Sequence, residues 1–511
     1  MTTLPLLRRR ISLEEALEDD DNVLQLLEYP QKLRDFKTRL ISLKADIEAT
    51  VAFHLRAKRC QVAAEDNWMM GNYNICIPVC VNPPSENHVL LRIPLPFKVG
   101  EENNPGNVDE KLRCEVATYI WIHNNCPTVP IPSLYGFGFP DGQTFVEPSS
   151  APFFSRFRWR TTQTLRSWLG YPTSCPYISL KRPTPLTTGY MIISIIKEGR
   201  QLSEYSLETL RGDKTRRQAL FSDLARIILT LNRTDFPRIG SLTLNNDGVI
   251  SLTNRPLTLR LQTLENEGIP TIPRDSVYQA TESYLLDLLQ CHDNRIYHQP
   301  NAIHDTEDGQ EQLAALTMMR ALLPQFISRQ YRHGPFRLTL TDLQPGNIFV
   351  DEEWHITAVI DLEFAAVLPV ELQTPVYWLT GRTIDDIEHG EHLETFESRI
   401  NEYIKAFEEQ ERNDPCSDFS HAQIMRSCWD KRSFWYFQAM HSPKGLLHVF
   451  REHIQHYYCE EHCRKRVFDE TVSPYWCEGA KSLIRRKVED EARYKNQLKE
   501  RFGQGSQIAP S

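Results

Sequence analysis

Long hydrophobic runs are missing from this sequence of 511 residues, and so is any strong excess of charge. No apolar run approaches the roughly 20 residues that a membrane-spanning helix requires, so we expect no membrane span. The formal net charge of −9 is modest for this length and argues against a protein dedicated to binding nucleic acid. The N-terminal order of an apolar patch, arginines and then acids fits neither a secretory signal nor a transit peptide.

Cysteine shows no regular framework either: twelve residues are scattered along the chain, which favours reduced thiols in the cytoplasm. One cluster, in the segment HIQHYYCEEHC, contains His453, His456, Cys459, His462 and Cys463. A zinc site needs four ligands that converge. These residues share one expected helix and point in several directions, so a helix without metal is the preferred interpretation.

The chain is too long for one compact core, so we expect more than one structural unit. Residues 12–58 have helical spacing and begin with a capping box formed by Ser12 and Glu15. From about residue 67, short β-rich segments alternate with turn signals, and one helix is expected over 108–126.

An insertion with one short helix is expected at 147–188, which is rich in Pro, Ser, Thr and Arg. Its arginines at 156, 158 and 160 could touch a membrane or an anionic ligand. The preferred interpretation is that they are surface side chains of the insertion without a binding role.

A buried strand is expected at 189–199, followed by helices that a strand pair interrupts at 236–260. The last helix, from Ala480 onward, is expected to be charged and exposed. This order predicts an α+β fold with two lobes, the first rich in strands and the second rich in helices.

In the segment LTLTDLQPGNIFVDEEWHITAVIDLEF (338–364), two expected strands around a loop place three of its acids, Asp342, Asp361 and Glu363, close to Asn347. Antiparallel pairing through DEEW would bring Asp361 beside Asn347, and both side chains offer the oxygen ligands that Mg²⁺ prefers. Asp342 could accept the proton of a hydroxyl during phosphoryl transfer. A solvated hairpin is the alternative to such a nucleotide–metal site. Glu363 stays open between orienting the site, binding metal and facing water.

The stretches TDLQPGNIFVD and VIDLE resemble the catalytic and metal loops of the aminoglycoside phosphotransferase and choline kinase-like family. The resemblance runs from about residue 67 to 450, and LRCEVATYIWI, VPIPSLYGFGF and ELQTPVYWLTG look like the fungal branch of that family. By this resemblance Asp342 matches the catalytic base, while Asn347 and Asp361 match the Mg²⁺ ligands. Leu340 departs from the pattern, because the family usually has His there.

The same resemblance implies a protein-kinase-like fold, with a small β-rich N-lobe and a large helical C-lobe. The phosphate-contacting Lys of the family is replaced by Arg92, with Glu115 as its expected partner and Lys98 as a fallback cation. Gly71 and Asn72, in the stretch GNYN, match the turn that covers the phosphates.

The implied domains are an N-terminal helical extension (1–60), an N-lobe (61–200), a C-lobe (201–450) and a C-terminal helical extension (451–511). The implied activity is the ATP- and Mg²⁺-dependent phosphorylation of a small-molecule hydroxyl. A catalytically silent kinase-fold binding protein is the alternative. A protein kinase is less favoured, because H-R-D, D-F-G and A-P-E motifs are missing from the sequence.

Overall fold

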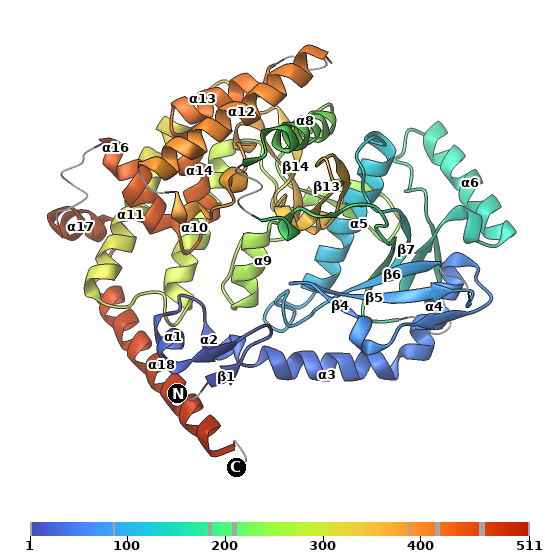
Figure 1. Cartoon of the computed structure of the whole chain (residues 1–511), viewed down its shortest axis with the longest axis horizontal. Coiled ribbons are helices and arrows are strands. Elements are labelled where there is room, and N and C mark those ends of the chain that lie inside the picture. Colours follow the sequence, from blue (N-terminus) through green and yellow to red (C-terminus); the bar gives the residue numbers. More distant parts are fainter. Residues whose placement is uncertain are drawn as a thin grey trace.

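An antiparallel sheet of eight strands lies on the right of Figure 1. The computed structural model describes residues 3–84, 87–181, 186–206, 212–387, 390–413, 419–458 and 466–508. In spatial order the strands are β3 (Cys60–Val62), β5 (Asn74–Val81), β6 (His88–Pro94), β10 (Tyr190–Ser194), β7 (Leu134–Gly138), β8 (Gln143–Val146) and β9 (Ile178–Lys181), and β4 (Met69–Met70) pairs with β5. The strand expected at 189–199 is therefore central, although it ends at Ser194.

Different helices cover the two faces of this sheet, because successive side chains of a strand point to opposite faces. Ile192 and its neighbours in β5 and β6 pack on α3 (Tyr29–Ser42) and α4 (Lys44–Leu55). Met191 and Ile193 belong instead to the large core that contains α5 (Asn107–Asn125). The helix expected over 108–126 is confirmed in α5.

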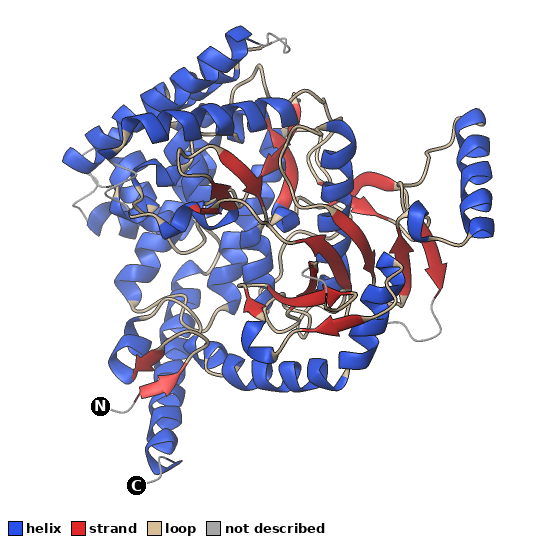
Figure 2. Ribbon diagram, turned by 45° about the vertical axis from the view of Figure 1, so that its right-hand side comes forward, coloured by secondary structure: helices blue, strands red, loops and turns tan. Residues whose placement is uncertain are grey.

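Helices make up most of the left-hand part of Figures 1 and 2. They are α8 (Lys214–Leu231), α9 (Leu259–Asn266), α10 (Thr281–His298), α11 (Thr306–Phe326), α12 (Glu391–Asn413), α13 (His421–Asp430), α14 (Ser433–His441), α15 (Leu446–Val449), α16 (His456–Tyr458) and α17 (Arg466–Val472). One continuous apolar core joins these helices, apart from α16, to α5 and to the inner face of the sheet. The α+β composition predicted from the sequence is confirmed.

Three small sheets lie within the helical part. The strand pair expected at 236–260 is formed by β12 (Ser241–Leu244) and β13 (Ile250–Asn254). The segment 338–364 is more elaborate than one strand pair. β14 (Phe336–Leu340) pairs with β17 (Ala365–Pro369), whereas β15 (Ile348–Val350) pairs with β16 (Ile356–Val359) and with β11 (Arg200–Gln201). Two sheets therefore hold the two ends of the central loop.

The N-terminal segment and the last helix pack on each other, in contrast to the exposed helix expected at the C-terminus. Residues 3–26 contain β1 (Thr3–Pro5), β2 (Arg10–Ser12), α1 (Leu13–Glu18) and α2 (Val23–Leu26). The capping box of Ser12 and Glu15 is present at the start of α1. Tyr494 and Leu498 of α18 (Ala480–Ile508) are buried against this segment, so one stripe of α18 is a core element.

The insertion at 147–188 contains α6 (Phe153–Trp168), a longer helix than expected, and the edge strand β9. Among the described residues, no helix has the length and the apolar composition needed to cross a membrane.

All nine cysteines in the described ranges are free thiols. In the cluster weighed for zinc, His453 is buried and its ring stacks on Trp435 with 3.5 Å between centroids. Cys459, His462 and Cys463 lie outside the described residues.

Candidate active site

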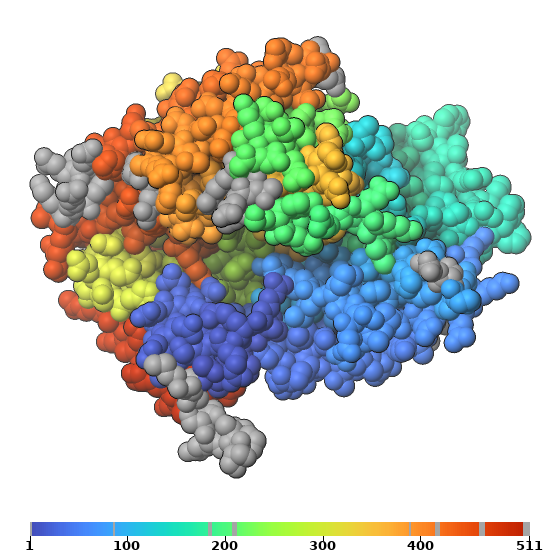
Figure 3. Space-filling view, viewed as in Figure 1, coloured from blue at the N-terminus to red at the C-terminus, as the bar shows by residue number. Residues whose placement is uncertain are grey.

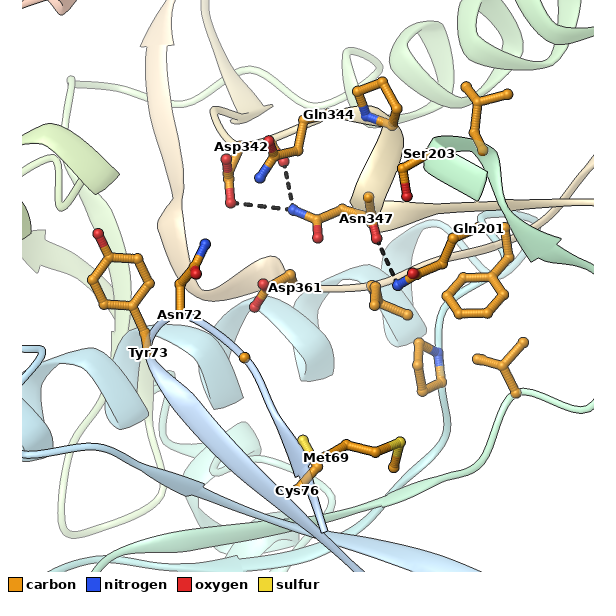
Figure 4. Close-up of a pocket in the computed structure, with 18 of the residues that line it drawn as sticks. Met69, Asn72, Tyr73, Cys76, Gln201, Ser203, Asp342, Gln344, Asn347 and Asp361 are labelled. Carbon is orange, nitrogen blue, oxygen red and sulfur yellow. Dashed lines mark hydrogen bonds between the residues drawn. The ribbon is translucent and has the colours of Figure 1, made fainter. Parts of the chain in front are cut away.

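The loop that follows β14 places Asp342 and Asn347 side by side (Figure 4). The amide Nδ2 of Asn347 donates to the backbone oxygen of Asp342 at 2.9 Å and to its carboxylate Oδ2 at 3.1 Å. A short 3-10 turn, Pro345–Asn347, leads directly into β15. Because Nδ2 makes both bonds, the amide oxygen Oδ1 of Asn347 remains available as a ligand.

The β15–β16 hairpin returns the chain to this loop, as the sequence predicted. Ile348 pairs with Val359, and the backbone N–H of Ile360 donates to the oxygen of Asn347 at 2.9 Å. Asp361 then adopts a left-handed backbone conformation, with φ 65° and ψ 58°, which Asp tolerates better than most residues. This backbone turn directs the Asp361 carboxylate into the cavity that Asp342 and Asn347 also line.

Arg92 of β6 connects this hairpin to the sheet and to α5. Its Nε lies 3.2 Å from Oε1 of Glu115, the partner expected from the sequence. Its Nη2 donates to Oε2 of Glu363 at 2.6 Å and also bonds Oδ1 of Asp361. The guanidinium, whose side chain is only 8% exposed, therefore contacts three carboxylates at once.

A second cation in this network, Lys111 of α5, is missing from the sequence-based hypothesis. Its Nζ lies 2.6 Å from Oε2 of Glu363 and 3.6 Å from Oε2 of Glu115, and it donates to Oδ1 of Asn74 at 2.8 Å. Lys111 precedes Glu115 by one helical turn and so shares its face, which is the signal that could have identified it. The fallback cation Lys98 lies elsewhere, 4.7 Å above the ring of Tyr29.

Glu363 is fully buried, so the interpretation of a solvated acid is wrong. Its Oε2 accepts from Asn74 Nδ2 at 2.6 Å in addition to the two cations. Burial alone would raise the pKa of Glu363, but the charges of Lys111 and Arg92 outweigh burial and lower it to about 2. Glu363 is therefore an ionised structural anchor that holds the end of β16 against α5 and β6.

The pKa values of the two acids that face the cavity, Asp342 and Asp361, are raised and not lowered. Burial and the charges of Asp361 and Glu363 raise the pKa of Asp342 to about 7. Burial also raises the pKa of Asp361, although the guanidinium of Arg92 opposes that effect. A carboxyl group with a pKa near 7 can take up or release a proton at neutral pH, as a general base must.

The cavity beside these residues has a volume of about 1030 Å³. Its lining includes Gly71 and Asn72 in the turn between β4 and β5, together with Arg92, Asn347 and Asp361. Figure 4 shows Asn72 in this turn, between Tyr73 and Asp361. The structure thus brings together the residues proposed for phosphate and metal contact from the sheet, α5 and the β15–β16 hairpin.

A second cavity, of about 540 Å³, meets the first at Asp342. Leu340, where the family pattern has His, lines this second cavity and packs on the large core. Burial lowers the pKa of His421 to about 3, and burial with the charge of Arg260 lowers the pKa of His441 to about 4. Both histidines in the lining are therefore neutral at pH 7.

Among the described residues, one group of side chains could hold a metal ion, and its ligand atoms are carboxylate oxygens. Those of Glu115, Asp361 and Glu363 lie within 4.8 Å of one another, but Arg92 and Lys111 already neutralise them. Asp361 is the acid of this set that also lines the cavity. The pair of Asp361 and Asn347 Oδ1 fits a hard cation that phosphate and water oxygens would complete.

Comparison with known proteins gives one family match: the model described as the phosphotransferase enzyme family (APH) matches residues 196–371. No curated protein sequence matches the chain at a significant level. Among solved structures, a macrolide 2'-phosphotransferase type I is 10% identical, with 85% of this chain and 97% of that chain covered and a TM-score of 0.33. An ethanolamine kinase of Plasmodium vivax is 12% identical, with 82% of this chain and 83% of that chain covered and a TM-score of 0.30.

Proposed function

We propose that this chain, whose residues 196–371 match the model of the phosphotransferase enzyme family, transfers the γ-phosphoryl group of ATP to a hydroxyl of a small molecule. The observation that carries the proposal is the meeting of two cavities at Asp342. The larger cavity carries the residues suited to metal and phosphate, and the smaller one leaves room for an acceptor.

In the proposed reaction, Asp342 accepts the proton of the acceptor hydroxyl while that oxygen bonds to the γ-phosphorus. The bond between the γ-phosphorus and the bridging β–γ oxygen breaks, and ADP leaves. Asn347 Oδ1 and the Asp361 carboxylate would hold Mg²⁺, which neutralises phosphate charge when it is bound. Arg92, fixed by Glu115, would contact the phosphates near the turn of Gly71 and Asn72.

The two-lobed, protein-kinase-like division stays part of this proposal. The sheet with α5 would be the N-lobe (61–200), and the helical part would be the C-lobe (201–450). The extensions 1–60 and 451–511, and the likeness to the fungal branch, stay predictions from the sequence.

The acceptor cavity supports an uncharged, largely apolar alcohol better than a polycation. Its described lining holds two carboxylates, Asp342, proposed as the base, and Asp385, which is exposed. Two cations, Arg260 and Lys444, also line it and disfavour a cationic acceptor. His421 and His441 are neutral, and Leu340 adds apolar surface. We therefore expect 1-decanol to be phosphorylated more efficiently than 10-amino-1-decanol, since the two alcohols differ chiefly in the charge at the far end.

A silent nucleotide-binding protein is the second candidate, because Arg92 occupies the Asp361 carboxylate that the proposal assigns to Mg²⁺. The test is a thermal shift with ATP and Mg²⁺, followed by turnover of labelled ATP with a panel of alcohols. Asp361→Asn should remove the Mg²⁺-dependent part of the shift. Glu352→Gln, an exposed acid in the same hairpin, should leave it unchanged. Binding without turnover by any alcohol would favour the silent protein, and absence of binding by the folded native chain would contradict both candidates.

A further inference from the structure

The helix α6 carries a large apolar surface that faces away from the rest of the chain. It lies at the edge of the molecule, at the opposite end from α18, in all three whole-chain views (Figures 1, 2 and 3). Phe154 is 84% exposed and Trp168 is 86% exposed, and the other large exposed apolar side chains of the helix are Phe153, Phe157 and Leu165. Aromatic side chains this exposed need an explanation, because folding alone gains nothing from them.

The helix attaches to the protein through its other face. Trp159 packs on a small apolar cluster formed by Val146, Ala151 and Ile178. Gln163, one turn further on, accepts from the backbone N–H of Ser174 at 3.0 Å. At 3.6 residues per turn, the aromatic side chains of the outer face point roughly opposite to Trp159. The amphipathic pattern therefore presents its apolar side to the surroundings.

The charge around this apolar face is entirely positive. Arg158 and Arg160 fall just outside its two edges on the helical wheel, and both are exposed. Neither forms an ion pair with any residue in the described ranges, whereas Arg166 lies 3.9 Å from Asp247. The sequence has no Asp or Glu between positions 148 and 197. A partner that covers this face must therefore be apolar at its centre and anionic around it.

We propose that α6 is an interfacial helix that docks the protein on a bilayer surface bearing anionic headgroups. Such helices lie in the plane of the interface, with Phe, Trp and Leu at the acyl boundary and arginines among the headgroups. A second copy of this chain is a poorer partner for the face, since it would bring two sets of unpaired arginines together. The inference is independent of the phosphotransferase activity.

Vesicle co-sedimentation of the full chain tests the proposal. We expect binding to vesicles of phosphatidylcholine with 30% phosphatidylserine, little binding to phosphatidylcholine alone, and weaker binding as salt is raised. The double variant Phe154→Ser/Trp168→Ser should weaken binding at least tenfold. Arg158→Glu/Arg160→Glu should weaken it about thirtyfold or more, because each arginine near an anionic surface contributes roughly a factor of five.

Matched controls lie at the opposite end of the molecule. Tyr475→Ser removes an aromatic side chain that is 80% exposed, and Arg485→Glu/Arg486→Glu reverses two exposed charges on α18. Both controls should bind vesicles as the native chain does. The proposal is overturned if the native chain does not bind anionic vesicles, or if the α6 variants bind them as well as the controls do. It is also overturned if light scattering shows a dimer that Phe154→Ser/Trp168→Ser dissociates.

Discussion

Replacing Lys111 by Met gives the sharpest test of the charge network behind the candidate site. Methionine keeps most of the length of the lysine side chain and removes its charge. Glu115 and Glu363 would then share a single buried cation, Arg92, with Asp361. Breaking a buried ion pair in this way leaves an uncompensated charge.

The size of the effect follows from the pKa of Glu363. A fall from the ordinary 4.5 to about 2 corresponds, at about 1.4 kcal/mol for each pH unit, to about 3 kcal/mol of stability. Because the folded pKa is lowered, this stabilisation is present above pH 4.5 and is lost as the pH falls toward 2. Lys111 is the strongest of the groups that lower this pKa, so most of the stabilisation should disappear in Lys111→Met. Losses of about 3–5 kcal/mol are typical when one partner of a buried pair is removed.

Denaturant unfolding at pH 7 and pH 4 measures both the size and the sign. We expect the unfolding free energy of Lys111→Met to be about 3 kcal/mol lower than that of the native chain at pH 7. This difference should shrink at pH 4, because protonation of Glu363 removes the uncompensated charge in the variant. Adding Glu363→Gln should recover part of the loss. Lys37→Met, whose half-exposed pair with Glu65 spans 3.1 Å, should cost less than about 1 kcal/mol. Equal stability of Lys111→Met and the native chain at pH 7, or a deficit that ignores pH, would refute the reasoning.

Three further predictions concern the base, the guanidinium and the N-terminal segment. The rate of phosphoryl transfer should rise with pH through about 7 as Asp342 ionises, which a pH–rate profile would show. Asp342→Asn should abolish transfer and raise the unfolding free energy by about 1 kcal/mol, which denaturant unfolding would show. Arg92→Lys keeps the charge but cannot bridge Asp361 and Glu363, so unfolding should become easier by about 1–3 kcal/mol in denaturant titrations. Hydrogen bonds to Asp20 and Glu491 raise the pKa of His304 to about 10, so the stability that protonated His304 contributes is full below pH 6.5 and is lost as pH rises through 10. The melting temperature of His304→Gln should therefore differ from that of the native chain at pH 7 and converge with it above pH 10.

The parts of the fold that sequence predicts well are those set by local pattern. The strands of the main sheet and the helix α5 have clear periodicity and turn signals, and α5 ends just before Pro127. The approach of Asp361 to Asn347 was predictable too, because the register of a hairpin is fixed by its turn. These features depend on neighbours in the sequence.

The features that were missed depend on residues far apart in the sequence. β14 pairs with β17 rather than with the strand that follows it, because the central loop separates the two sheets. The buried stripe of α18 is hidden in a charged sequence, since among its described side chains those packed in the core with the N-terminal segment are Tyr494, Leu498 and Phe502. No local pattern specifies which distant segment covers such a stripe.

The coexistence of the acids in 338–364 has a second physical basis, which the sequence did not reveal. The hypothesis relied on a bound metal to offset their repulsion, yet the protein supplies two buried cations of its own, Arg92 and Lys111. These cations fix Glu363 in its ionised form, and they leave Asp342 with a pKa that burial and its acidic neighbours raise to about 7. Asp361 shares both features, because it bonds the cation Arg92, as Glu363 does, and faces the cavity, as Asp342 does. An incoming cation must therefore compete with Arg92 for Asp361, and phosphate oxygens that engage the guanidinium would make that exchange easier. In the proposed function, this competition would favour the binding of Mg²⁺ together with a nucleotide over the binding of Mg²⁺ alone.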